Sequence, residues 1–288
     1  MPQFVRWNSQ PLDEWHQKYA TGKFIDLDGH FTHYIEKGEG QPVILLHGWF
    51  YDSQMWNQNI DALAKCFKVY AMDLWGFGYS TRETLDWGYP LYAGQLLKFM
   101  DTLSIEKASL VGQSIGGGTS ILFCLQHRER VKKIVLVDSG GMPNPPRLMT
   151  RITCLPCVGE LLFSLGSSRK GILKSMFIRD EKAIAGYFEK LTRFHQIKGT
   201  TETLLSSLRK NFFDKLLPEI NKLGEMEVPI LIVWGRYDRS IRLELGQEMQ
   251  KILKGSRLEI LDNAGHSSNY EQPEKFNQIV TGFLTTGI

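Results

Sequence analysis

The chain has few cysteines, no excess of one charge and no long apolar run, and each absence removes a class of protein. Only four cysteines are scattered over 288 residues, too few for a disulfide-rich fold. The 34 basic residues nearly balance the 31 acidic ones, so we expect no nucleic-acid partner. No uninterrupted apolar run approaches about 18 residues, the length that would indicate a transmembrane segment. The N-terminus also lacks the pattern of a secretory signal, and we therefore expect a soluble protein of the cytoplasm.

What is present is a serine between two glycines, in Gly112-Gln113-Ser114-Ile115-Gly116. An apolar run at 107–111 precedes it and a helical segment at 119–126 follows, so Ser114 should stand on a sharp turn from a strand into a helix. This pattern is typical of a nucleophile elbow, in which small neighbours allow the turn and the backbone presents the hydroxyl. The amide of Ile115 would lie at a helix N-terminus, where it can bind negative charge. The pattern also arises by chance, so it needs a base, an acid and a second donor to support it.

The order of apolar runs predicts a mainly parallel sheet. Runs at 42–48, 67–74, 107–111 and 131–138 alternate with helical segments, and two further runs follow at 228–235 and 257–261. Before them, polar and apolar side chains alternate in residues 23–29 and 30–36, on either side of an Asp-Gly turn. This pattern predicts a hairpin, in which we expect His30 and His33 to be solvated.

Residues 141–217 interrupt this regularity. They lack a strand pattern and contain helical stretches at 147–152, 159–165, 182–195 and 201–208. The segment has 13 basic and 6 acidic residues, whereas the rest of the chain is net acidic. We therefore expect a core domain formed by 1–140 and 218–288, with 141–217 inserted as a helical cap. The basic excess is either a solvated outer face or a means of attracting an anionic partner.

Candidates for the acid and the base follow the late strands. Asp238 comes directly after the run at 228–235, and His266 follows the run at 257–261, so both should lie at the carboxyl edge of the sheet. Ser114, Asp238 and His266 thus occur in the order nucleophile, acid, base. Asp138 also follows a strand and is the alternative acid. His47 is the alternative base, although we favour a structural role for it.

The loop after the run at 42–48 supplies the second anion donor. Gly48 lets the backbone turn so that the Trp49 amide can join that of Ile115 in an oxyanion hole. For the pocket we expect a mainly apolar lining. Its predicted substrate-binding residues are Phe50, Gln113, Leu161 and Phe163.

These segments together resemble the α/β-hydrolase fold family. The resemblance rests on His47-Gly48-Trp49, 73–80, 112–116, 234–238 and Ala264-Gly265-His266, and it covers nearly the whole chain. It implies an eight-stranded, mostly parallel sheet with an inserted helical cap, a Ser114–His266–Asp238 triad, and no cofactor or metal. Some members carry the acid after the strand that ends at Asp138, which keeps that alternative open.

The activity that the resemblance implies is hydrolysis of a small, apolar carboxylic ester of short to medium acyl chain. The alternative is cleavage of a C–C bond in 1,5-diketones, because the C–C hydrolases have a similar cap and a similar Trp234-Gly-Arg segment. Those enzymes tend to carry tryptophan after the base and often asparagine before the nucleophile, where this chain has Ser267 and Gln113. A slow-turnover small-molecule receptor would share every motif. A lipase is suggested only by the apolar stretch 152–165, and the oligomeric state stays open.

Overall fold

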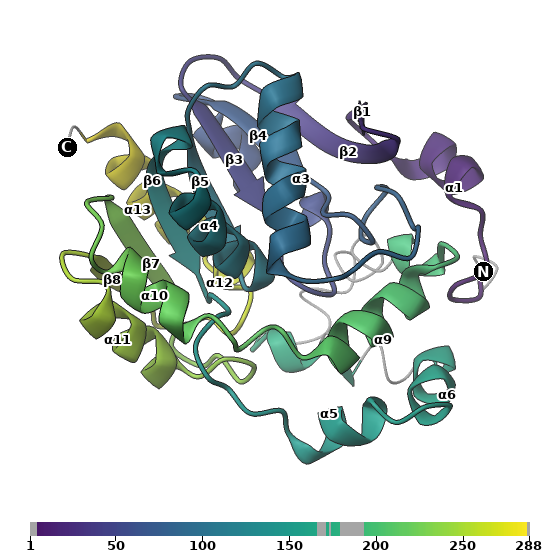
Figure 1. The fold of residues 1–288 in the computed structure, drawn as a ribbon. Coiled ribbons are helices and arrows are strands. Elements are labelled where there is room, and N and C mark those ends of the chain that lie inside the picture. Colours follow the sequence, from purple (N-terminus) through teal and green to yellow (C-terminus); the bar gives the residue numbers. More distant parts are fainter. Residues whose placement is uncertain (1–4, 166–170, 173, 179–192, 287–288) are drawn as a thin grey trace.

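One eight-stranded sheet organises the protein (Figure 1). The computed structural model describes residues 5–165, 171–172, 174–178 and 193–286. The strands are β1 (Lys23–Leu27), β2 (His30–Lys37), β3 (Pro42–Leu46), β4 (Lys68–Met72), β5 (Ala108–Gln113), β6 (Val131–Val137), β7 (Ile230–Gly235) and β8 (Arg257–Leu261). Their order is β1-β2-β4-β3-β5-β6-β7-β8; β2 pairs antiparallel with β1 and β4, and all other pairs are parallel. The prediction of a mostly parallel eight-stranded sheet is confirmed.

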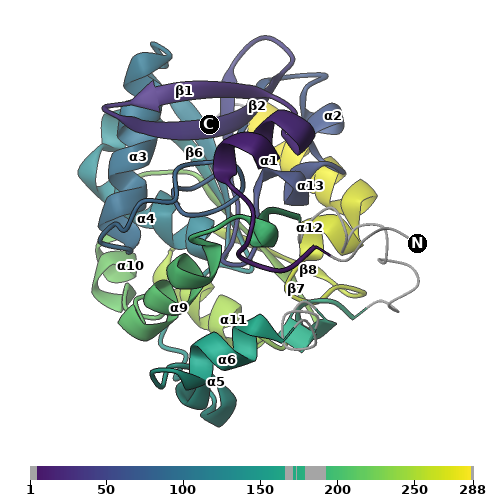
Figure 2. The ribbon, with the colours of Figure 1, turned by 90° about the vertical axis from the view of Figure 1, so that its right-hand side faces the viewer.

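Helices cover both faces of this sheet, which is why its central strands are apolar throughout. On one face lie α3 (Tyr89–Thr102), α4 (Ile115–Gln126), α10 (Leu217–Leu223) and α11 (Leu243–Ile252). On the other lie η1 (Ser53–Trp56), α2 (Ile60–Leu63), α12 (Ser268–Glu271) and α13 (Pro273–Thr285), as Figure 2 shows from the side. Every residue of β5 and β7 is buried between these two layers. None of the described helices is long and apolar enough to cross a bilayer.

The segment predicted as a cap is helical where the structure describes it. It contains α5 (Leu148–Thr153), α6 (Val158–Ser164), η3 (Arg193–Gln196) and α9 (Thr200–Lys210). In both views α5, α6 and α9 lie together at one end of the molecule (Figures 1 and 2). Most of the helix predicted at 182–195 lies outside the described residues. The division into core and cap therefore stays a prediction.

The N-terminal arm lies against this segment. The arm includes α1 (Leu12–Tyr19), whose buried Trp15 is part of the hydrophobic core. Gln10 forms a bridge with Ile197, and the Trp15 indole donates to the Arg193 carbonyl at 3.1 Å. The arm thus joins the start of the chain to η3 and the residue that follows it.

His33 is buried, contrary to the expectation of a solvated strand residue. Its strand β2 lies inside the sheet, between β1 and β4, so the side chain faces the loop that follows β4. Nδ1 lies 2.7 Å from an Asp73 carboxylate oxygen and Nε2 lies 2.8 Å from the Thr21 carbonyl. Both neighbours are acceptors, so both nitrogens donate and the ring is an imidazolium. Asp73 also accepts from the Ser53 and Tyr79 amides, so its carboxylate holds the loops that follow β3 and β4.

This buried ion pair predicts a large stability effect. Burial lowers the pKa of His33, but the Asp73 charge outweighs it and leaves that pKa raised. Burial raises the pKa of Asp73, but the His33 charge and hydrogen bonds lower it to about 2. Because removing one partner leaves the other charge buried and unpaired, His33→Ala should lower the unfolding free energy by about 3 to 5 kcal/mol. The matched change His30→Ala, on the same strand but partly exposed, should cost about 1 kcal/mol or less.

The pH dependence of this stabilisation has two limits. The His33 contribution is complete below about pH 6.5 and is lost as the pH rises through its raised pKa. The Asp73 contribution is complete above about pH 4 and is lost as the pH falls toward about 2. Urea unfolding of both variants, repeated at pH values that span both limits, measures the loss of unfolding free energy. Equal losses of unfolding free energy for His33→Ala and His30→Ala would contradict the predicted role of the ion pair.

Candidate active site

Ser114 stands alone between β5 and α4, in a strained backbone conformation. Its φ of 51° and ψ of −113° fall in a region that residues with a side chain rarely adopt. A Cβ on Gly112 would run into the Gly116 backbone, and a Cβ on Gly116 would run into the Leu46 carbonyl. The two glycines are therefore needed so that β5, α4 and the end of β3 can approach one another around the serine.

His266 and Asp238 form a hydrogen-bonded pair in the loops after β8 and β7. The ring Nδ1 donates to one carboxylate oxygen of Asp238 at 2.7 Å. The other oxygen accepts from the amides of Ser240 at 2.7 Å and Ile241 at 2.9 Å, which orients the carboxylate. Burial lowers the pKa of His266, but the charge and hydrogen bond of Asp238 outweigh it, so the pKa is raised. Because Nδ1 carries a proton, Nε2 is the nitrogen available to accept one in the neutral ring.

Asp138, the alternative acid, makes no hydrogen bond to His266. It follows β6 with a φ of 43° and is fully buried. Its two oxygens accept from the amides of Gly235 at 2.7 Å and Ser268 at 3.2 Å. Burial, together with the nearby Asp238 charge, raises the pKa of Asp138 to about 7. Asp138 thus ties the end of β7 to the start of α12, the two segments that flank the His266–Asp238 pair.

Three buried contacts hold the loop that carries His266, and sequence analysis did not identify them. The Gln113 side-chain amide donates to the His266 carbonyl at 2.6 Å. The Gly265 amide donates to Glu271 at 2.6 Å, and the Ser267 and Tyr51 hydroxyls are 2.6 Å apart. Gln113 and Tyr51 come from distant parts of the chain, so no local pattern marks their contacts, whereas Glu271 follows Gly265 by only six residues.

The amides of Trp49 and Ile115 are placed for anion binding. A Cβ built on Gly48 would lie 3.1 Å from the Ser114 Cβ, so the loop after β3 passes directly beside the serine. Ile115 is the first residue of α4, where a backbone amide has no acceptor within its own helix. Neither amide donates a hydrogen bond within the described part of the chain. Both are therefore available to an oxygen bound next to Ser114.

His47, the alternative base, is held inside the loop. Its Nδ1 donates to the Gly48 carbonyl at 2.8 Å, and its Nε2 accepts from the Leu74 amide at 2.9 Å. Burial lowers its pKa, and the ring is neutral with both nitrogens occupied. A structural role, as favoured from the sequence, fits these contacts.

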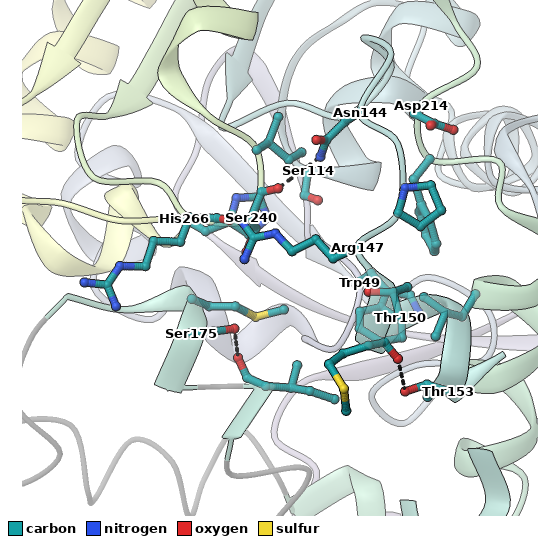
Figure 3. Close-up of a pocket in the computed structure, with 18 of the residues that line it drawn as sticks. Trp49, Ser114, Asn144, Arg147, Thr150, Thr153, Ser175, Asp214, Ser240 and His266 are labelled. Atoms are coloured by element: carbon teal, nitrogen blue, oxygen red, sulfur yellow. Dashed lines mark hydrogen bonds between the residues drawn. The ribbon is translucent and has the colours of Figure 1, made fainter. Parts of the chain in front are cut away.

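Ser114 and His266 line one cavity of about 620 Å³ (Figure 3). The Trp49 ring also lines it, and its indole nitrogen donates to Ser207 of α9 at 2.9 Å. The exposed surface of the described lining is mainly apolar, as expected, although several of its side chains are polar. These include Asn144, Arg147, Thr150, Thr153, Arg239 and Ser240. They come from the segment leading into α5, from α5 itself and from the loop after β7, which also contribute apolar residues such as Met149 and Ile241.

The predicted substrate-binding residues need correction. Phe163 lines the cavity, but Phe50, Gln113 and Leu161 are not among its described lining residues. Phe50 and Gln113 are fully buried, and the Gln113 amide points to the His266 carbonyl. Leu161 is largely exposed on the outer side of α6, while its neighbour Leu162 faces the cavity. In the part of the chain described here, no three His, Cys, Asp or Glu side chains form a metal-binding group.

Known proteins share both the sequence pattern and the fold. Residues 41–153 match the sequence model of the alpha/beta hydrolase fold, and 215–288 match that of TAP-like proteins. A 2-hydroxy-6-oxononadienedioate/2-hydroxy-6-oxononatrienedioate hydrolase of Comamonas testosteroni is 30% identical, covering 93% of this chain and 98% of its own. From the same organism, a 2-hydroxy-6-oxo-6-phenylhexa-2,4-dienoate hydrolase is 29% identical, over 93% and 96% of the two chains.

Solved structures extend this similarity. A meta-cleavage product hydrolase of Pseudomonas fluorescens IP01 superposes with a TM-score of 0.77 at 27% identity, covering 91% of this chain and 97% of that one. An esterase of Exiguobacterium antarcticum superposes with a TM-score of 0.79 at 22% identity, over 92% and 100%, which shows a common fold. The chain belongs to the α/β-hydrolase fold family.

Proposed function

We propose that this protein hydrolyses carboxylic esters of short to medium acyl chain through an acyl-enzyme on Ser114. The observation that carries the proposal is that Ser114, on its strained turn, lines the same cavity as His266, which is hydrogen-bonded to Asp238. This combination provides a nucleophile, a base and a group that orients the base.

In the first step, Ser114 Oγ attacks the ester carbonyl while His266 Nε2 accepts the hydroxyl proton. Asp238 holds Nδ1–H, so that Nε2 is the basic nitrogen, and its charge stabilises the imidazolium that forms. The negative oxygen of the tetrahedral intermediate binds the amides of Trp49 and Ile115, each worth about a hundredfold or more in rate. His266 then gives its proton to the departing alkoxide.

In the second step, water attacks the acyl-enzyme and transfers a proton to His266 Nε2. The second tetrahedral intermediate collapses, the acid leaves, and the proton returns to Ser114. The balance is one ester and one water converted to one acid and one alcohol. A cavity of about 620 Å³ is of the usual size for a small organic ligand.

The second candidate is C–C bond hydrolysis, favoured by the names of the curated relatives. The two positions at which this chain departs from that group, Gln113 and Ser267, are buried beneath the cavity rather than in its described lining. Each is engaged in holding the His266 loop, Gln113 directly and Ser267 through Tyr51. Both departures therefore affect the support of the His266 loop rather than contacts with a dienoate, and we place ester hydrolysis first because the exposed lining of the cavity is mainly apolar.

A side-by-side substrate comparison tests this order. We expect repeated turnover of p-nitrophenyl esters, with kcat/KM highest among acyl chains from acetate to octanoate and lower for palmitate. For 2-hydroxy-6-oxo-6-phenylhexa-2,4-dienoate we expect kcat/KM to be at least about tenfold lower, because pocket contacts set such ratios. A faster reaction of the dienoate would reverse the order of the two candidates. Binding without repeated turnover of either substrate would instead indicate a receptor.

A further inference from the structure

The outer side of α5 and α6 is unusually apolar. Eight large apolar side chains are exposed in the described part of the chain, and five of them lie between 148 and 165, with exposed fractions of 49% to 71%. We call this group the α5–α6 patch. It consists of Leu148, Met149, Leu155, Leu161 and Leu165.

The opposite side of the same two helices lines the cavity. Leu162 and Phe163 of α6 face it, as do Thr150 and Thr153 of α5, while Met149 is both exposed and part of the lining. A surface helix normally keeps one polar side for water. Because α6 carries large apolar side chains both toward the cavity and toward solvent, its outer side is suited to contact another apolar surface. That surface would meet the protein at the edge of the cavity.

Positive charge predominates around the patch, since the acidic Glu160 of α6 is paired with Arg209. Arg147, Arg151 and Arg239 are exposed, and none of them forms an ion pair within the described residues. Arg147 and Arg239 also line the cavity, and Figure 3 shows Arg147 reaching toward Ser240. Over the described residues of 141–217, eight basic residues stand against three acidic ones. The partner surface should therefore be both apolar and anionic.

A second copy of the chain fits these features poorly, since a symmetric contact would bring the same arginines together. The side chains of the patch are leucine and methionine, whereas the strong contacts of protein interfaces favour tryptophan and tyrosine. Aliphatic side chains flanked by arginine are typical of helices that lie at the surface of a membrane. We propose that the α5–α6 patch is a docking surface for an anionic phospholipid bilayer.

This proposal predicts binding to vesicles by the full-length protein. It should co-sediment with phosphatidylcholine–phosphatidylglycerol vesicles and much less with phosphatidylcholine alone. The double variant Leu155→Ser/Leu165→Ser should lower the partition coefficient at least about tenfold, since each leucine loses its apolar contact with lipid. Arg151→Gln should lower it about fivefold on anionic vesicles only. Added salt should weaken binding of the wild type.

Phe31→Ser is the matched control, because Phe31 is exposed to a similar degree on β2. It should bind vesicles like the wild type. Hydrolysis of p-nitrophenyl acetate without vesicles should be unchanged in all variants, which separates docking from the ester-hydrolase proposal and verifies folding. Equal partition of Leu155→Ser/Leu165→Ser and the wild type, or no binding to any vesicle, would overturn the proposal. So would a dimer that this double variant dissociates in sedimentation velocity, since the patch would then bind a second copy.

Discussion

Ser114→Ala is expected to lower kcat for p-nitrophenyl butyrate by about 10⁴-fold or more, since the acyl-enzyme can no longer form. The oxyanion amides and the cavity would remain, so a small residual rate above the uncatalysed one should persist. KM should change little, because the lost hydroxyl is small and the cavity lining is otherwise intact. Steady-state kinetics on purified protein measures both quantities.

Ser120→Ala provides the matched control. Ser120 is a buried serine of α4, and its hydroxyl donates to the Gly116 carbonyl at 2.9 Å rather than lining the cavity. Its replacement should leave kcat within about twofold of the wild type and cost about 1 kcal/mol of stability. Mass spectrometry with a phosphonate inhibitor should show one adduct on wild type and Ser120→Ala, and none on Ser114→Ala. More than a small percentage of wild-type turnover in Ser114→Ala would place the nucleophile elsewhere.

Asp238→Asn is expected to lower kcat by about 10³- to 10⁴-fold through the tautomer of His266. The amides of Ser240 and Ile241 both donate to one side of this residue, so they should hold the asparagine oxygen on that side. The asparagine NH₂ would then face His266 Nδ1 and donate to it. The ring proton would move to Nε2, which could no longer accept the proton of Ser114.

Asp138→Asn tests the alternative acid with the same chemical change. Asp138 touches the amides of Gly235 and Ser268 and not the ring of His266, so kcat should fall by less than about tenfold. The asparagine NH₂ would face one of the two backbone amides that donate to a carboxylate oxygen in the wild type. Two donors would then face each other, which should cost about 1 to 3 kcal/mol of stability. If Asp138→Asn lost more activity than Asp238→Asn, Asp138 would be the acid.

The pH profile provides a second measurement on the same variants. Ester attack needs neutral His266, so kcat/KM should fall as the pH falls through the pKa of that ring. Because the pKa of His266 is raised, this acid limb should lie above about pH 6.5 in the wild type. The negative charge of Asp138 contributes to raising that pKa, so Asp138→Asn should move the limb to lower pH. An unchanged limb would mean that the carboxyl carries no charge when the ring titrates.

Most of the fold could be predicted from local patterns, because each strand and helix is short and the residues that determine it are contiguous in the sequence. Continuous apolar runs indicated strands buried on both faces, and β5 and β7 are buried along their whole length. His33 shows where such reasoning fails. A histidine beside a hairpin turn is usually solvated, but pairing of β2 with β4 brought this one against Asp73, 40 residues away.

The cavity shows the same limit. Leu161, Leu162 and Phe163 are consecutive apolar residues, so composition alone does not say which of them faces inward. The rotation of α6 about its own axis directs Leu162 and Phe163 toward the cavity and leaves Leu161 exposed to solvent. Gln113 is adjacent to Ser114 in sequence, yet its side chain leaves the opposite side of the strand and holds the His266 loop.

The sequence by itself determined the succession of strands along the chain and the family, and it placed Ser114, Asp238 and His266 each after a recognisable strand. Only the tertiary structure decided which carboxylate meets His266: Asp138 and Asp238 both follow neighbouring parallel strands, and their difference is one of side-chain direction. Direction depends on contacts with backbone amides. Asp238 accepts from the nearby amides of Ser240 and Ile241, whereas Asp138 accepts from those of Gly235 and Ser268, 97 and 130 residues away. The contacts of Asp138 form only when the chain packs, and no local pattern records them.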